Sequence, residues 1–139
     1  MRLALFQPDI PQNAGTIIRL CAGFDVPGDI IEPWGFVFSD AKVRRAHMDY
    51  QQRAIINRHK SCTDFETKNT PNRMVLLTTK GSKNLEEFDF SSMDTLIMGS
   101  ESRGVPETIH QIISHKVRVP INPNTRSLNV AVCASMVLW

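Results

Sequence analysis

The chain has 139 residues, 42% of them hydrophobic and 22% charged, and a formal net charge of +2. This composition is typical of one soluble globular domain over residues 1–139 and excludes a polycation. The apolar runs are far shorter than the roughly 20 residues that cross a bilayer. The N-terminal run is too short for a secretory signal. We therefore expect a cytoplasmic protein that makes no membrane contact.

The cysteines and histidines give no sign of a disulfide framework or a metal site. Cys21, Cys62 and Cys133 are widely scattered, without a CxxC pair. Such cysteines are typical of reduced thiols in a cytoplasmic protein. Cys21 and Cys133 fall on apolar helical faces and are expected to be buried. The four histidines lack the HxxxH and HxH spacings of metal ligands. We therefore expect no bound metal.

Strand-like and helix-like segments alternate from end to end of the chain. Short apolar or β-branched runs predict strands over residues 2–6, 29–32, 54–58, 74–79, 95–98 and 117–121. Helical spacing predicts helices over 14–24, from 39 or 40 to 50, over 62–68, from 106 onward and over 128–139. Asn13 is expected to cap the first helix, and Pro106 to occupy the first position of the fourth. The buried stripe of that fourth helix is expected to comprise Ile109, Ile112 and Ile113.

Repeated strand–helix units with apolar strands are typical of a mostly parallel sheet with helices on both faces. The predicted fold class is therefore α/β, in one compact domain. The last helix is apolar nearly all round over residues 130–139 and needs cover on every side. Either the native chain continues beyond Trp139, or a second subunit covers this helix.

The charge is unevenly distributed. Residues 42–60 carry six basic side chains, Arg44, Arg45 and Arg58 among them, against the single acid Asp49. This stretch is either a phosphate-binding face or an ordinary solvated helix face.

Three loops that follow predicted strands carry polar residues suited to a ligand site. They read QPDIPQNAGTIIR (7–19), IMGSESRGVPETI (97–109) and VPINPNTRSLNVAV (119–132). In open parallel sheets, ligands bind where such loops gather. Arg19 is either a functional group or a surface arginine, and Ser127 either a helix cap or a ligand contact. No GxGxxG, GxxxxGK[ST] or GxSxG is present, which weakens the dinucleotide-binding, P-loop and hydrolase interpretations.

These three loops, together with IIEPWGF, RRAHMDY and LLTTKG, resemble the motifs of the SPOUT (α/β-knot) RNA methyltransferases. The resemblance covers essentially the whole chain. It is greatest to the small single-domain members that methylate the ribose 2'-oxygen of the wobble nucleotide (cytidine or modified uridine) in tRNA anticodon loops. Two departures are the serines of Gly-Ser-Glu-Ser-Arg-Gly, where relatives often have proline and threonine, and the end of the sequence at Trp139.

The resemblance implies a C-terminal trefoil knot, a homodimer formed through the knot region, and S-adenosylmethionine bound in the knot. The implied cofactor residues are Leu77, Thr78, Gly99, Glu101, Val119, Ile121, Ser127 and Leu128. The implied catalytic residues are Arg19, Asn13, Glu101, Ser127 and Asn129, with Arg19 reaching the cofactor site of the other subunit. The residues expected to bind RNA, the anticodon stem-loop of tRNA, are Arg19, Arg44, Arg45, Arg58 and Arg126.

Two other functions are compatible with this sequence. One is ribose methylation of a different RNA such as ribosomal RNA, although those enzymes usually resemble two-domain proteins. The other is a non-catalytic RNA-binding knot protein, which would retain tRNA without transferring a methyl group.

Overall fold

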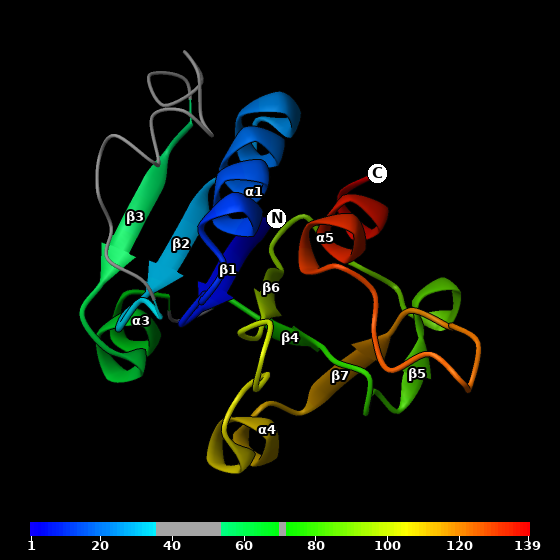
Figure 1. Ribbon diagram of the computed structural model, residues 1–139. Coiled ribbons are helices and arrows are strands. Elements are labelled where there is room, and N and C mark those ends of the chain that lie inside the picture. The colour runs from blue at the N-terminus through cyan, green and yellow to red at the C-terminus, as the bar shows by residue number, and fades with distance from the viewer. Residues whose placement is uncertain (36–53, 70–71) are drawn as a thin grey trace.

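The computed structural model describes residues 1–35, 54–69 and 72–139. The helix expected to end at residue 50, and with it Arg44 and Arg45, lies outside the described residues. Within them, seven strands form one sheet in the order β3-β2-β1-β6-β4-β7-β5, and every strand pairing is parallel (Figure 1). The strands are β1 (Arg2–Phe6), β2 (Gly28–Ile31), β3 (Ile56–His59), β4 (Met74–Leu77), β5 (Lys83–Asn84), β6 (Thr95–Met98) and β7 (His115–Arg118).

Helices cover both faces of this sheet. They are α1 (Pro11–Phe24), α3 (Cys62–Asn69), α4 (Glu107–Ile112) and α5 (Val130–Leu138), with a 3-10 turn, η2, at Leu85–Glu87. In Figure 1, α1 and α5 lie on one side of the strands, and α3 and α4 on the other. The predicted α/β class, with a mostly parallel sheet between helices, is confirmed. No helix in the described part of the chain is long and apolar enough to cross a membrane.

The core consists of two layers because successive side chains of a strand point to opposite faces. Leu3 and Leu5 of β1 pack with Ile17 of α1 and Ala134 of α5. Ala4 and Phe6, the alternate residues of β1, face the opposite layer and pack there with Phe65 of α3. Strands buried on both faces therefore read as continuous apolar runs, which is why β1, β4 and β6 were recognisable in the sequence.

The first helix begins earlier than predicted. Pro11 occupies its first turn, since the fixed φ of proline suits a helix start. Ile10 is the N-cap residue and makes no side-chain cap hydrogen bond. The prediction that Asn13 caps this helix is therefore wrong, and Asn13 is free for another contact.

The boundaries of the later elements also differ from the predicted ones. Pro106 was expected at the first helical position of α4 but is its N-cap residue, so that helix begins one residue later. Asn129, rather than Ser127, caps α5. The final helix thus begins at Val130, and β7 ends at Arg118, so residues 119–129 form one long loop. The strand β5 and the turn η2 were not predicted, because two polar residues carry no strand pattern.

Two of the burial predictions are corrected by the structure. Ile112 is 58% exposed, so it does not belong to the buried stripe of α4, whereas Ile109 and Ile113 pack against the core. The short helix turns Ile112 outward from that layer. The three cysteines are free, with Cys21 buried and Cys133 only half-buried.

An ion pair joins the starts of two central strands. Asp94, just before β6, is fully buried and accepts hydrogen bonds from Nε and Nη2 of Arg73, each 2.7 Å long. The backbone N–H of Ser91 donates a third, at 2.8 Å. Burial by itself would raise the pKa of Asp94, but the bonds from Arg73 and Ser91 outweigh it and lower the pKa below its ordinary value.

We expect Asp94→Asn to lower the free energy of unfolding by about 2 kcal/mol at pH 7, because the bonds to the charged carboxylate weaken. Since the folded pKa is depressed, this stabilisation is present above the unfolded value of about 4 and disappears as the pH falls through the folded pKa. Urea unfolding at pH 7 and at pH 3 measures the difference. The exposed Asp25→Asn is the control, and an equal loss for D94N at both pH values would contradict the prediction.

Candidate functional site

A pocket of about 560 Å³ opens at the carboxyl ends of β4, β6 and β7. Parallel strands place the loops that follow them at one edge of the sheet, which is where ligands bind in such folds. The volume is in the range of small-molecule and cofactor sites. All eight residues expected to hold a cofactor line this one pocket: Leu77, Thr78, Gly99, Glu101, Val119, Ile121, Ser127 and Leu128. Asn13, Arg126 and Asn129 line it too.

Glu101 links the loop after β6 to the loop after β1. Its Oε1 accepts a hydrogen bond of 3.0 Å from the side-chain amide of Asn13. Its Oε2 accepts one of 2.9 Å from the backbone N–H of Asp9. Both oxygens of the carboxylate are thus held by donors from residues 9–13, the end of the loop after β1 and the first turn of α1.

Asn13 extends this contact to the start of the last helix. Its Oδ1 accepts a hydrogen bond of 2.9 Å from the Nδ2 of Asn129. The Oδ1 of Asn129 in turn accepts from the backbone N–H groups of Ala131, at 2.8 Å, and Val132, at 3.3 Å. The two amides therefore form a chain of hydrogen bonds with one direction, from the first turn of α5 to the carboxylate of Glu101. We call it the amide relay.

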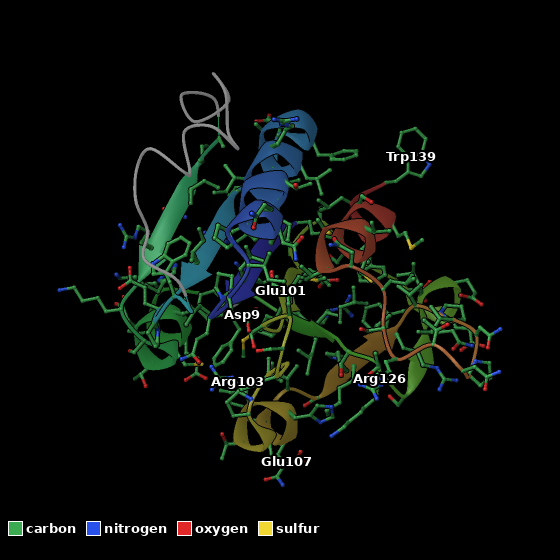
Figure 2. All side chains as sticks on the ribbon, viewed as in Figure 1. Asp9, Glu101, Arg103, Glu107, Arg126 and Trp139 are labelled. Atoms are coloured by element: carbon green, nitrogen blue, oxygen red, sulfur yellow. The ribbon has the colours of Figure 1, made fainter. Side chains whose placement is uncertain are left out.

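Asp9 also contacts Ser102, the residue after Glu101. Its Oδ2 accepts hydrogen bonds from the hydroxyl and from the backbone N–H of Ser102, the latter at 3.2 Å. Figure 2 shows Asp9 and Glu101 next to each other, with Arg103 and Glu107 toward α4 and Arg126 over β7. The loops after β1 and β6 are thereby joined by several polar contacts.

The two neighbouring carboxyl groups shift each other's protonation. Burial raises the pKa of Glu101, and the adjacent Asp9 side chain raises it further. The pKa of Asp9 is lowered, first by the neighbouring Glu101 side chain, which can donate a proton to it, and then by Ser102. Because like charges in contact disfavour double ionisation, the first proton taken up by this pair resides on Glu101.

Glycines shape the loop after β6. A Cβ on Gly99 would lie 2.6 Å from the backbone carbonyl carbon of Gly104, closer than real contacts allow. Gly104 has a φ of +69°, which favours glycine, and its N–H donates to the carbonyl of Ser100. The loop can fold back on itself beside the pocket only with both glycines in place.

The arginines expected at the site lie in different places. Arg126 lines the pocket, whereas Arg19 is exposed on α1 and does not line it. Arg58 lies on β3, with its guanidinium paired with the carboxylate of Glu32 and 5.4 Å from the Trp34 ring centroid. Its charge is therefore partly compensated within the protein. Arg44 and Arg45 lie outside the described residues.

Some residues that line or support the pocket were not singled out from the sequence. Lys80 and His110 line it, and Asp9 supports it from behind. Asp9 was visible inside the loop QPDIPQNAG, but no motif in the sequence showed that it faces Ser102, 93 residues later. His110 carried no signal, because a histidine on a short helix is usually a surface residue. Among the described residues, no group of three or more potential ligands could hold a metal ion.

Solved and curated proteins resemble this chain over nearly its whole length. It is 51% identical, over 98% of its length and 86% of the relative's, to a "tRNA (cytidine(34)-2'-O)-methyltransferase" of Beijerinckia indica subsp. indica. It matches a structure described as "Structural insights into the 2-OH methylation of C/U34 on tRNA" with a TM-score of 0.93 and 34% identity, covering 98% of this chain and 90% of that one. An "AdoMet bound rRNA methyltransferase" from Sinorhizobium meliloti matches with a TM-score of 0.87 and 26% identity, over 99% of this chain and 53% of that one.

The resemblance seen in the sequence is thus confirmed at the level of the family. The family model described as "SpoU rRNA Methylase family" matches residues 1–139, and this chain belongs to that family.

Proposed function

We propose that this protein transfers a methyl group from S-adenosylmethionine to the ribose 2'-oxygen of nucleotide 34, the wobble nucleotide, in tRNA. The observation that carries the proposal is its 51% identity over nearly the full chain with a tRNA (cytidine(34)-2'-O)-methyltransferase. The structural neighbour that concerns the 2'-OH of C/U34 agrees with it. The protein is therefore a tRNA ribose methyltransferase.

The pocket suits S-adenosylmethionine. Leu77, Val119 and Leu128 offer apolar walls for an adenine ring, and Thr78 and Ser127 offer hydroxyl groups for the polar atoms. When bound, the cofactor supplies an activated methyl group on its sulfonium. We assign the eight predicted cofactor residues to this role because they converge on one cavity of sufficient size.

The polar residues of the pocket position the ribose. Asn13, Glu101 and Asn129 form the amide relay, which fixes the shape of the wall where the three loops meet. Ser127 closes the pocket beside them. In-line transfer to a hydroxyl depends mostly on holding the reacting atoms in line, so a rigid wall contributes directly to the rate.

Arg19 and Arg126 contact the RNA in this proposal. A guanidinium with a pKa above about 12 is a poor base but an excellent phosphate ligand. Arg126 binds RNA at the pocket itself, and Arg19, exposed and outside the lining of its own pocket, serves the site of a second subunit. Arg58, with Arg44 and Arg45, adds positive charge for the anticodon stem-loop, reduced at Arg58 by Glu32.

The second subunit covers the apolar surface near the C-terminus. Val132 and Met136 of α5 are 46% and 45% exposed, and Trp139 is 97% exposed. Phe24, at the end of the neighbouring α1, is 38% exposed as well, and a homodimer would bury these apolar side chains. The trefoil knot implied by the family and the cytoplasmic location belong to the same proposal.

Methylation of ribosomal RNA is the second candidate, favoured by the ribosomal RNA methyltransferase among the structural neighbours. This chain matches only 53% of that neighbour, which is therefore nearly twice as long as the matched part. The tRNA enzyme matches over most of both chains, and we therefore favour tRNA.

We expect the purified protein to transfer labelled methyl groups from S-adenosylmethionine to tRNA, with nuclease mapping placing 2'-O-methyl at nucleotide 34. Unmodified and cellular tRNA are tested in parallel, since a prior base modification can be required. Methylation of ribosomal RNA alone would support the second candidate. Retention of tRNA without transfer would support a non-catalytic RNA-binding protein.

We expect Arg19→Ala to keep cofactor affinity and to lose methyl transfer by about a hundredfold or more, because Arg19 contacts RNA rather than the cofactor. Mixing R19A with Glu101→Gln subunits tests the shared site. If Arg19 acts across subunits, random exchange of subunits makes about a quarter of all sites intact, with both Arg19 and Glu101 present. Transfer by R19A near the wild-type rate, or no recovery on mixing, would contradict one or the other part.

Substitutions of Asn129 can separate its two roles, the capping of α5 through Oδ1 and the hydrogen bond to Asn13 through Nδ2. Asn129→Asp keeps an oxygen for the first turn of α5 but cannot donate to Asn13, so we expect a free energy of unfolding within about 1 kcal/mol of wild type. Methyl transfer should fall by roughly tenfold or more. Asn129→Ala loses both contacts and should reduce stability as well. Equal rates for N129D and wild type in single-turnover assays would show that the relay does not contribute.

A further inference from the structure

Asp9 does not line the pocket, yet it contacts both Glu101 and its neighbour Ser102. Its backbone N–H donates to Glu101 Oε2 at 2.9 Å, and its carboxylate accepts from the N–H of Ser102 at 3.2 Å and from the Ser102 hydroxyl. Its other oxygen, Oδ1, is buried and has no hydrogen-bond partner among the described residues. Buried acceptors without a partner are costly and uncommon, so this oxygen requires an explanation.

We propose that Asp9 is a positioning residue for the methyl transfer. It holds Glu101 and Ser102 in place so that the Glu101 carboxylate accepts the hydrogen bond from Asn13 that ends the amide relay. The inference rests on the function proposed above and adds a residue to it. Asp9 acts through Glu101 and Ser102, since it lies behind the pocket wall rather than in it.

The relay is strongest when Glu101 is ionised, because a charged carboxylate oxygen is a better acceptor than the oxygen of a neutral carboxyl group. Each of its oxygens then accepts one N–H, from Asn13 and from the backbone of Asp9. A protonated Glu101 has an O–H to donate, and the buried Oδ1 of Asp9 is the adjacent acceptor without a partner. Protonation on Oε2 therefore adds a contact from Glu101 to Asp9 and leaves Oε1 as a neutral, weaker acceptor for the amide of Asn13.

The sign of the pH dependence follows from the charges around Glu101. Burial and the Asp9 carboxylate raise the pKa of Glu101, so the relay has its full strength at high pH and weakens as the pH falls through that raised value. The other titratable residues that line the pocket are Lys80, Arg103, Glu107, His110, Arg126 and Cys133. Asp9 is the charged group in contact with Glu101 on the side of α1, where Asn13 is neutral.

Asp9→Asn separates charge from shape, because asparagine keeps an oxygen for the Ser102 N–H but removes the negative charge beside Glu101. We expect the acidic limb of the single-turnover methyl-transfer rate in D9N to move to lower pH by on the order of one pH unit. We expect Asp9→Ala, which loses the contacts to Ser102, to transfer roughly tenfold more slowly across the pH range. Affinity for S-adenosylmethionine, measured by calorimetry, should stay within about threefold in both variants.

Asp25→Asn is the matched control, since it removes the same charge from an exposed site at the other end of α1. Its acidic limb should coincide with that of wild type. The side-chain amide protons of Asn13, followed by NMR, should titrate with Glu101, and their midpoint should move down in D9N. This second measurement does not depend on RNA or on turnover.

The outcomes distinguish the inference from the function on which it rests. Suppose that the wild-type protein transfers methyl groups but that D9N shifts neither the acidic limb of the pH–rate profile nor the titration midpoint of the Asn13 amide. Either unmoved quantity would overturn the role of Asp9 and leave the proposed function standing. Absence of transfer by the wild-type protein would contradict the proposed function, while the Asn13 titration would still test the contact. Should D9A fail to fold, D9N carries the test, because it is nearly isosteric.

Discussion

The amide of Asn13 is the interaction on which the architecture of the site depends. It lies in the first turn of α1, donates to the carboxylate of Glu101 and accepts from Asn129, so three loops that are far apart in the sequence meet at one side chain. An amide can do this because it carries a donor and an acceptor on one rigid plane. An aspartate in its place would offer only acceptors when ionised and would face Glu101 with a like charge.

The direction of that relay is imposed by the backbone of the last helix. The first turn of α5 has N–H groups without partners in the helix, and these fix the Oδ1 of Asn129 as an acceptor. Its Nδ2 must then point toward Asn13, which in turn presents its own Nδ2 to Glu101. Packing of α5 against α1 in the core therefore determines which way two side chains at the pocket are oriented.

Much of this could be predicted from the sequence, because the fold depends on patterns within short windows. The apolar runs at β1, β4 and β6 predicted buried strands, and parallel topology placed their loops at one edge. The exact boundaries could not be predicted where two local signals competed. Pro11 and Asn13 each suit a helix start, and Ser127 and Asn129 each suit a cap. In the structure Pro11 begins α1 and Asn129 caps α5, and the side chains of Asn13 and Asn129 bond each other.

Asp9 lay beyond reach for a different reason. Its loop was recognised, but the role of its carboxylate depends on a partner 93 residues away and on an oxygen whose burial is a property of the folded chain. Two carboxyl groups in contact repel each other when both are ionised. Here the same two loops that bring Asp9 to Ser102 bring Glu101 to Asn13, so the repulsion between the carboxyl groups accompanies the geometry of the pocket wall. The carboxylate that accepts from Asn13 at the start of α1 therefore belongs to a pair of carboxyl groups that disfavours double ionisation.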